Sequence, residues 1–399
     1  MSATLRTSHP LDEPDLLGLI EAAFERPDRE SRFVELIARQ HPSFDPGLSL
    51  LAEAEGQAAG YALFLPREIL IRGVGVPLAI AAPLGVLPQV RGQGIGRLLV
   101  SAGLAALADR GLRGAIAIGA PDFYGDLGFA SAFDLHAVHA RPEHLPPPDE
   151  SSPWRAITSE DLEALVRLQA ESYEHASGTE TRHPSPIEWD GQAPGSHALA
   201  LGAPGDPQAY LRFRVRGELE IMECCANDSD SVHAILALIH RLIQEHSKAL
   251  ALVHVPPETR VSTTLLHRGA LLEHSTFGGG SMLAITDFEG LMEDLAPWWA
   301  PTLANTPFSI GFSGETYSLD ASGMNPRVTH GRAEHHLEVP SPALPGLLTG
   351  QRSARELLFD PAVRHQSGLS EEGEALACRL FPRGSAMWTY APTFELMDT

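Results

Sequence analysis

The chain has 399 residues, of which 43% are hydrophobic and 20% are charged. This length exceeds one ordinary hydrophobic core, so we expect two or three domains of about 100 to 200 residues each, and the composition contains no low-complexity block that would predict disorder. The formal net charge is −22, and a field of that sign repels phosphate backbones and anionic lipid, which excludes nucleic acid and membrane as expected partners and favours a cationic amine.

The N-terminal residues contain no apolar signal segment, and no uncharged apolar stretch reaches the roughly 18 residues of a membrane span. We therefore expect a cytoplasmic protein. The three cysteines form no metal-binding or disulfide pattern, so incidental thiols are expected. The pairs His136/His139 and His335/His336 have no third ligand at a recognisable spacing, which predicts half-buried or surface imidazoles and no bound metal.

The first region predicts an α/β fold built on a mixed sheet. Two amphipathic helices are followed by strands on either side of a hairpin signal at 55–57, and Leu78 to Leu87 is apolar almost throughout, as in a strand at the centre of a sheet. A helix from Ile95 to about Arg110 and a buried strand then complete a crossover. The expected helices are 15–24, 30–39 and 95–110, and the expected strands are 48–54, 60–66, 69–76, 78–87 and 114–119.

Changes in composition divide the chain into three expected domains, at 1–149, 150–294 and 295–399. Three prolines at 146–148 stiffen a linker before the second domain. The second domain repeats the order of the first, with strands at 208–215 and 218–225, a helix at 232–245 and a strand at 249–255. The third predicts a hairpin around Ser313-Gly314-Glu315, followed by helices.

The segment Arg91-Gly92-Gln93-Gly94-Ile95-Gly96 has the properties of a diphosphate cradle. Glycines allow backbone N–H groups to converge without side chains in the way, and the helix that begins at Ile95 adds its positive end. By itself a G-x-G-x-G run also fits a plain turn before a helix. Its position after the fourth or fifth strand disfavours a Rossmann site, and the continuation Gly96-Arg97-Leu98 excludes a P-loop.

On these residues the chain resembles the GNAT family of N-acetyltransferases. The loop matches the family pattern Q/R-x-x-G-x-G/A, and Phe123 to Phe129 is similar to its Y-G-x-x-G-F signature. The resemblance implies that acetyl-coenzyme A is the co-substrate, and that a splayed strand at 84–88 pairs with its pantetheine arm. The implied cofactor-binding residues are Leu84, Gly85, Val86, Arg91, Gly92, Gln93, Gly94, Ile95 and Gly96.

The resemblance also assigns the catalytic roles. An amine that attacks the thioester creates an oxyanion, which the Val86 N–H stabilises, and a thiolate leaving group, which Tyr124 protonates as general acid. A phenol of ordinary pKa, about 10, is protonated at neutral pH. The alternative for Tyr124 is a packing residue in a turn, and no His or Glu is evident as a base for the incoming amine.

The whole chain resembles the enhanced intracellular survival (Eis) family, with tandem GNAT regions and a sterol-carrier-protein-like C-terminal domain. That family implies a homo-oligomer, a hexamer, that acetylates varied amines, with the C-terminal carboxylate, here that of Thr399, as a possible base. One departure bears on this role, because members tend to stop near the aromatic residue after the tryptophan, corresponding to Trp388 and Phe394, whereas this chain continues through 395–399.

Two other functions stay open at this point. A non-catalytic acyl-coenzyme A sensor or regulatory protein would share the glycine loop but would tolerate loss of Tyr124. A lipid carrier built on the last domain rests on fold analogy alone. Since Asn227-Asp228-Ser229-Asp230 stands in the second domain where glycines would be needed, we expect one cofactor per chain, held by the first domain.

Overall fold

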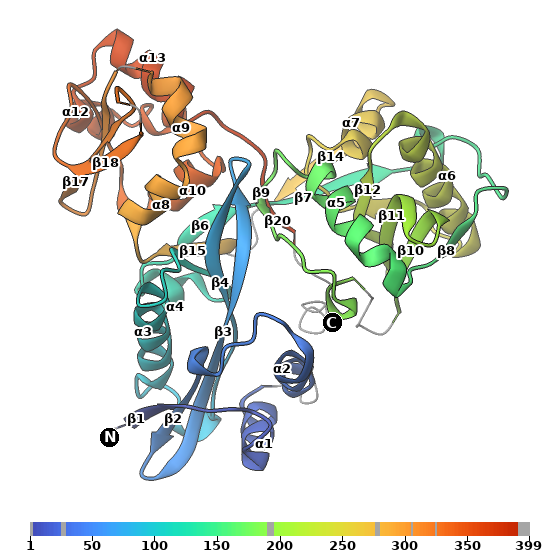
Figure 1. Ribbon diagram of the computed structural model, residues 1–399, viewed down its shortest axis with the longest axis horizontal. Helices are drawn as coiled ribbons and strands as arrows, with labels where there is room; N and C mark the ends of the chain where they lie inside the picture. Colours follow the sequence, from blue (N-terminus) through green and yellow to red (C-terminus); the bar gives the residue numbers. More distant parts are fainter. Residues whose placement is uncertain are drawn as a thin grey trace.

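The computed structural model describes residues 3–24, 29–189, 195–275, 280–304, 306–323 and 325–389. Thr399 lies outside these ranges. Within them the helices are short, and none is both long and apolar enough to cross a membrane. The chain forms two large mixed sheets and a smaller sheet, each with helices packed on it (Figure 1).

The first sheet has seven strands in the order β1-β2-β3-β4-β5-β15-β6. Only β4 and β5 pair in parallel, and the other neighbours are antiparallel, so the expected mixed α/β fold is confirmed. β4 is the central strand, as its apolar sequence predicts. The strands are β1 (Ala3–Thr7), β2 (Ser49–Ala54), β3 (Gln57–Ile71), β4 (Val74–Val86), β5 (Gly114–Ile118), β6 (Ala130–Phe133) and β15 (Ser281–Ile285).

Where the sequence predicts three strands, at 60–66, 69–76 and 78–87, the structure has two, and the turn falls inside the predicted middle strand. β3 runs through Pro66 to Ile71, and β4 starts at Val74 and continues to Val86. The turn between them is at Arg72 and Gly73, whose φ angles of 55° and 77° lie in the left-handed region that suits a tight hairpin. The alternation of apolar residues indicated strands correctly but placed this turn too late.

Helices cover both faces of the first sheet. The helix α3 (Ile95–Ala108) packs through Leu99, Val100 and Leu107 against one face. α1 (Pro14–Ala23) and α2 (Arg29–Gln40) pack on the other face, in a core that continues into the C-terminal region. The glycine loop connects the end of the central strand β4 to the start of α3, so it lies at the end of the sheet where that strand stops.

The second sheet repeats this arrangement. Its order is β14-β7-β13-β12-β11-β10-β8, again with one parallel pair, β12 and β13. The helix α6 (Ser229–Glu245) connects these two strands, as α3 connects β4 and β5, and α5 (Leu162–Ser172) and α7 (Arg260–His267) pack on the same unit. The strands are β7 (Leu135–Ala140), β8 (Trp154–Ala156), β10 (Ser196–Ala203), β11 (Asp206–Val215), β12 (Leu219–Ala226), β13 (Ala251–Val253) and β14 (Leu271–Ser275).

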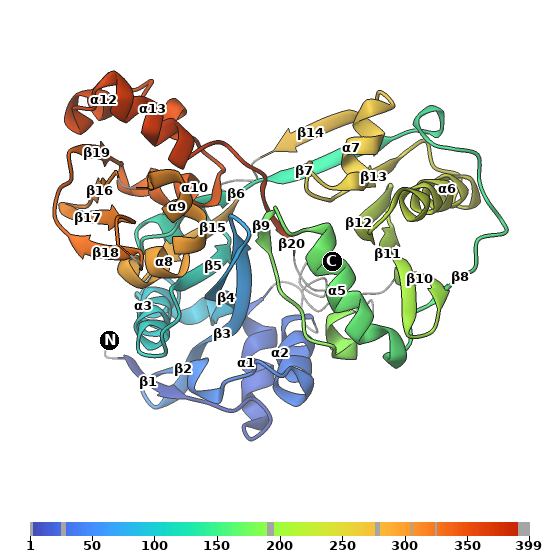
Figure 2. The ribbon, with the colours of Figure 1, turned by 45° about the horizontal axis from the view of Figure 1, so that its top comes forward.

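The two sheets exchange one strand each. β7 precedes the expected boundary at 149 but lies between β13 and β14 of the second sheet, while β15 returns from the second region to separate β5 from β6 (Figure 2). In each sheet the exchanged strand is the neighbour of an edge strand, β14 in the second sheet and β6 in the first. Strand pairing therefore crosses the expected boundary between residues 149 and 150. The division of the chain into three domains stays a prediction.

The C-terminal region contains a four-stranded sheet in the order β18-β17-β16-β19 and several short helices. The expected hairpin around Gly314 is β16 and β17. The strands are β16 (Phe308–Phe312), β17 (Glu315–Asp320), β18 (Arg327–His330) and β19 (His335–Glu338), and the helices are α8 (Phe288–Asp294), α9 (Ala296–Leu303), α10 (Leu344–Thr349), α11 (Ala354–Leu357), α12 (Pro361–Ser367) and α13 (Glu371–Leu380).

The β3–β4 turn touches both other regions. The Arg72 guanidinium donates hydrogen bonds to Leu348 O (3.0 Å) and Pro382 O (2.9 Å) of the C-terminal region. Its backbone N–H donates to Ser177 Oγ (2.9 Å) beside the second sheet. Figure 1 shows these two regions on opposite sides of the hairpin. A further strand pair, β9 (Ser177–Thr179) with β20 (Ala386–Thr389), runs alongside.

Candidate active site

The glycine loop has the backbone conformation that its sequence predicts. Gly92 and Gly94 have φ angles of 76° and 85°, which side-chain-bearing residues rarely adopt. Gly94 is the N-cap of α3, so the first N–H groups of this helix have no partner within it. A Cβ atom at Gly92 or Gly94 would meet no heavy atom within 4 Å. The loop therefore leaves free space in front of a helix N-terminus.

The end of β4 is open on one side. β4 pairs with β5 only at Ala79 and Ile80, whereas its pairing with β3 continues to Val86. Leu87 N–H donates to Ala59 O of β3 (3.0 Å), so the alternation along a strand turns the backbone groups of Val86 the other way. The Val86 carbonyl accordingly accepts a hydrogen bond from Arg91 Nε (3.0 Å). The N–H of Val86 faces the same open side.

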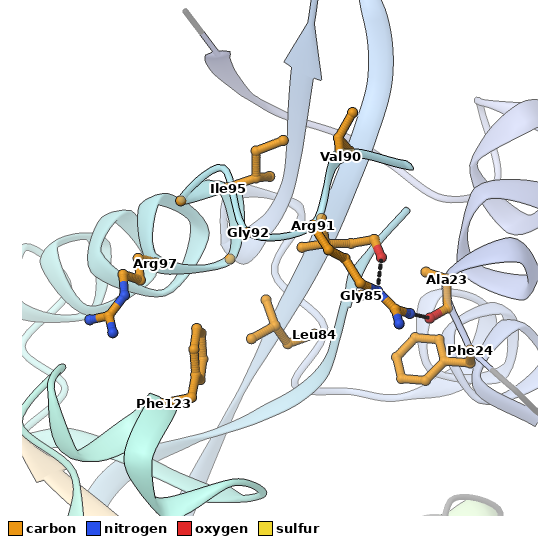
Figure 3. A pocket seen from close by; sticks show the side chains of 13 residues that line it. Ala23, Phe24, Leu84, Gly85, Val90, Arg91, Gly92, Ile95, Arg97 and Phe123 are labelled. Carbon is orange, nitrogen blue, oxygen red and sulfur yellow. Dashed lines mark hydrogen bonds between the residues drawn. The ribbon is translucent and has the colours of Figure 1, made fainter. Parts of the chain in front are cut away.

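A cavity of about 580 Å³ lies between the glycine loop and the open edge of β4. Eight of the nine residues predicted to bind the cofactor line it, and Gln93 does not. Figure 3 shows the Phe123 ring opposite Leu84, with the N-terminal turn of α3 beside them. The lining residues are Ala23, Phe24, Leu84, Gly85, Val86, Val90, Arg91, Gly92, Gly94, Ile95, Gly96, Arg97 and Phe123.

Sequence reasoning missed five of these lining residues. Ala23 and Phe24 come from the end of α1, nearly 70 residues before the loop, and no local pattern marks them. Phe123 lies directly before the predicted acid, and a Cβ atom at Gly96 would be 3.3 Å from its ring, a close contact that favours glycine at the third position of the loop. Arg97 could have been found, because a cation in the first turn of the helix lies near any phosphate bound there.

The two arginines at the cavity have different partners. The Arg91 guanidinium donates to Val86 O (3.0 Å) and to Ala23 O (2.6 Å), so it ties the end of β4 to the end of α1 (Figure 3). Arg97 pairs with Asp126 (2.5 Å), and its guanidinium lies 5.9 Å from the centre of the Phe123 ring. Arg97 is half-exposed in an ion pair that water screens, so it is the cation better able to turn toward an anion.

Tyr124 is buried and is not among the residues that line the cavity. It lies on the short helix α4 (Pro121–Gly125), with 6% of its surface exposed and its ring between those of Phe123 (5.0 Å) and Phe129 (5.2 Å). Burial raises the pKa of the Tyr124 phenol to about 12, so it is neutral at pH 7. Among the described residues, none forms a hydrogen bond with its hydroxyl. Its role as general acid stays a prediction.

The corresponding place in the second sheet is built differently. A cavity of about 520 Å³ lies beside the first turn of α6 and is lined by Ser229, Arg260 and Arg268 among others. Asp228 caps this helix by accepting a hydrogen bond from Ser231 N–H (2.8 Å). A carboxylate fixed at the helix N-terminus competes with a phosphate for the same N–H groups.

Known proteins resemble this chain in sequence over its first part and in fold over nearly its whole length. A family model described as an acetyltransferase (GNAT) domain matches residues 4–132. The uncharacterized N-acetyltransferase YhbS of Escherichia coli K12 is 33% identical over 128 residues, which are 32% of this chain and 74% of that protein.

Solved structures share the fold over nearly the whole chain. A GCN5-related N-acetyltransferase from Anabaena variabilis has a TM-score of 0.75 at 16% identity, with 97% of this chain and 99% of that chain covered. Eis1 from Mycobacterium abscessus has a TM-score of 0.65 at 18% identity, with 98% and 99% covered. The match to the family model includes the glycine loop and the open strand β4, and the match to YhbS covers 74% of that protein. The chain therefore belongs to the GNAT family of N-acetyltransferases and is an acetyltransferase enzyme.

Proposed function

We propose that this enzyme transfers the acetyl group of acetyl-coenzyme A directly to a primary amine in the cavity between the glycine loop and β4. The observation that carries the proposal is the combination of free space over Gly92 and Gly94 with the open edge of β4. A diphosphate needs converging N–H donors, and an extended amide-containing arm needs an unpaired strand edge. The two lie side by side around one cavity.

The residues of the cavity fit the parts of this co-substrate in order along its length. The first turn of α3 offers N–H groups and Arg97 to the diphosphate. The backbone of Leu84, Gly85 and Val86 offers donors and acceptors to the pantetheine amides. Arg91 adds positive charge where β4 meets the loop, although its hydrogen bonds to Ala23 and Val86 hold it at the rim.

The proposed reaction is attack by a neutral amine nitrogen on the thioester carbonyl carbon. The C–N bond forms, the carbonyl oxygen gains negative charge, and the Val86 N–H stabilises it. The C–S bond then breaks, and the Tyr124 phenol protonates the sulfur. The proton that the amine nitrogen loses restores the phenol or passes to solvent. This role requires the Tyr124 hydroxyl to reach the sulfur, although Phe123 lines the cavity and Tyr124 does not.

The finer features implied by the Eis resemblance belong to the same proposal. The matching strand orders of the two large sheets, each with one parallel pair and one exchanged strand, support tandem GNAT regions. Asp228 at the start of α6 supports a single cofactor per chain. A sterol-carrier-like last domain, a hexamer and the Thr399 carboxylate as base are proposed from the resemblance alone. The net charge of −22 favours a cationic amine.

The purified full chain tests this proposal when it is incubated with acetyl-coenzyme A and a panel of polyamines, aminoglycosides and lysine peptides. Release of free thiol that depends on an amine is the expected result. Tight cofactor binding with no turnover on any amine would instead support the alternative function, a non-catalytic acyl-coenzyme A sensor or regulatory protein. The Gly94→Glu variant should lose cofactor binding, because its carboxylate would enter the phosphate site, whereas Gly111→Glu, also at a positive φ but beyond the other end of α3, should retain it.

A further inference from the structure

Three potential metal ligands meet where β6 leads into β7. Asp134 directly follows β6, His136 lies on β7, and His274 lies on β14. The pairing of the two strands places His136 and His274 directly opposite each other, and Asp134 lies two residues before His136 and so shares its face of the strand. The sequence pairs His136 with His139, which faces the other way, so only the fold reveals the third ligand.

The distances between the potential ligand atoms of the three side chains range from below to above the distance between two ligand atoms of a zinc site. Asp134 Oδ2 is 2.7 Å from His274 Nε2, and one ligand atom from each of the three residues lies within 4.8 Å of the others. Tetrahedral zinc with bonds of about 2.0–2.1 Å separates its ligand atoms by about 3.3 Å. The His274 side chain is 40% exposed, so its ring can move by the required amount without disturbing a core.

His136 supplies a second and independent indication of a ligand. Its surface is only 8% exposed, and its Nδ1 atom is buried with no hydrogen-bond partner among the described residues. An unsatisfied buried polar atom of this kind destabilises the folded state. A metal bond would give this ring the partner that it lacks.

The Asp134 carboxylate is held as metal-binding carboxylates commonly are. Gln351 Nε2 donates a hydrogen bond to Asp134 Oδ1 (2.9 Å) and another to Ser131 Oγ (2.7 Å). This leaves Oδ2 on the side of His274. A neighbour that fixes the second oxygen of a ligand orients the first. Because Gln351 follows α10, the C-terminal region would control ligand geometry in the second sheet.

The space next to the cluster allows a fourth ligand. A cavity of about 310 Å³ is lined by Asp134 and His274, together with Ser131, Gln351, Arg352, Glu356 and Arg383. Arg383 is paired with Glu356, which offsets part of its charge. The two arginines still oppose a dication, so the affinity should be lower than that of a site with four protein ligands.

We propose that Asp134, His136 and His274 bind one divalent transition-metal ion, with a water molecule in the position that faces the cavity. Two imidazoles and one carboxylate are a ligand set suited to zinc and its first-row neighbours. The ion would connect β7 and β14 and, through Gln351, the C-terminal region. It therefore stabilises the junction of three parts of the chain, since it binds only the folded state.

Zinc binding by the tag-free, EDTA-treated full chain tests the proposal. We expect one Zn²⁺ per chain in competition with a chromophoric chelator, a higher melting temperature with Zn²⁺, and visible d–d bands when Co²⁺ replaces it. His274→Gln removes a partly exposed ligand and should weaken binding at least tenfold, while His139→Gln, on the same strand but paired with Glu273, should not. Gln351→Leu, which removes a positioning residue, should weaken it about 10–100-fold.

Melting temperature and far-ultraviolet circular dichroism without metal establish that each variant is folded. The absence of stoichiometric Zn²⁺ binding by the wild-type chain would overturn the proposal. Equal affinities of wild type, His274→Gln and His139→Gln would overturn it as well, because the ion would then lie elsewhere. Should His274→Gln not fold, the Co²⁺ spectrum of the wild-type chain decides, since three protein ligands of this kind give intense bands and hexaaqua cobalt does not.

Discussion

At the scale of single residues, glycines determine where side chains and a cofactor can lie. A Cβ atom at Gly119 would be 2.5 Å from Cε2 of Tyr124, so only glycine lets this ring pack against the end of β5. At Gly92 and Gly94 the same missing atom leaves empty space instead. One residue type thus holds the proposed acid in place and keeps the proposed phosphate site open.

Replacing Tyr124 by phenylalanine should lower kcat and leave the affinity for acetyl-coenzyme A near that of the wild type. The phenol is neutral at pH 7 because its pKa is raised to about 12, and a general acid typically contributes about 10²–10⁴-fold. Steady-state kinetics and cofactor titration measure the two effects separately. Tyr61→Phe is the matched control, because Tyr61 is also buried but lies in the core on the other face of the sheet, where its hydroxyl hydrogen-bonds with Ser49. An unchanged kcat would remove Tyr124 from the mechanism.

At the scale of elements, the position of α3 on β3 depends on close contact at one helical glycine. A Cβ atom at Gly103 would lie 2.0 Å from Cε2 of Phe64, whose side chain is fully buried. The helix that presents its N-terminus to the cavity therefore rests directly on this ring. Helix propensity alone would favour alanine at this position, so packing decides the residue.

Gly103→Ala should lower the free energy of unfolding by on the order of 1–3 kcal/mol, the usual cost of overpacking a core. Gly18→Ala is its control, since Gly18 is also inside a helix but a Cβ atom there would meet nothing within 4 Å. That change should raise stability by about 0.5–1 kcal/mol through helix propensity. Thermal melts of both variants measure the contrast, and the same sign of change in both would contradict it.

A buried group of charges joins β3 to the segment after β9. Arg67 pairs with Glu180 (3.2 Å) and Glu188 (2.6 Å), and Trp388 Nε1 of β20 donates to Glu180 Oε1 (3.1 Å). His41 Nδ1 accepts a hydrogen bond from Ser43 N–H, so its proton is on Nε2, which lies 3.1 Å from Glu188 Oε1. The neutral imidazole therefore donates to the carboxylate.

This group predicts a loss of stability in acid. Burial opposes ionisation of Glu188, but hydrogen bonds from His41 and Arg67 outweigh it and lower the pKa of Glu188 to about 2. A carboxyl whose folded pKa lies below its unfolded value of about 4.5 stabilises the fold above pH 4.5, here by on the order of 3 kcal/mol, and this contribution is lost as the pH falls toward 2. Burial likewise lowers the pKa of His41. The fold therefore also loses stability as the pH falls below about 6.5, because the imidazole takes up a proton more readily in the unfolded chain than in the buried site.

Melting temperatures of the wild type and Glu188→Gln at pH 7 and pH 3 measure this effect. The variant should be clearly less stable at pH 7, and the difference should shrink at pH 3, where the wild-type carboxylate has lost part of its stabilising effect. Asp12→Asn, at an exposed carboxylate, should change neither value. Equal differences for Glu188→Gln at the two pH values would show that its charge does not contribute.

At the scale of the whole molecule, the exchange of β7 and β15 makes the two large sheets dependent on each other. β15 supplies the hydrogen bonds between β5 and β6, and β7 supplies those between β13 and β14. A fragment of residues 1–149 would keep the glycine loop but would lack β15, leaving two strand edges unpaired.

We therefore expect the 1–149 fragment to aggregate or to melt without cooperativity, and to bind acetyl-coenzyme A more weakly than the full chain. Circular dichroism, calorimetry and cofactor titration measure these properties. The matched comparison is residues 1–149 joined by a short linker to 280–286, which restores β15. A cooperative melt of the unmodified fragment with full cofactor affinity would show that the exchanged strand is dispensable.

The sequence by itself determined the features that depend on short stretches of chain. The loop from Arg91 to Gly96, the apolar strand before it and the helix after it are adjacent in sequence, so their residue types and spacing predicted an α/β fold and a diphosphate site. The resemblance of these residues to a known family then implied eight of the residues that line the cavity. The same local rules located α1, α2, α3 and α6.

Only the tertiary structure decided the features that join distant segments. The exchange of β7 and β15, the contribution of Phe24 to the cavity, the burial of Tyr124 and the meeting of His136 with His274 all depend on pairings across tens to more than a hundred residues. No local periodicity encodes such a pairing, because either edge of a strand presents the same backbone groups. The packing of the whole chain selects the partner.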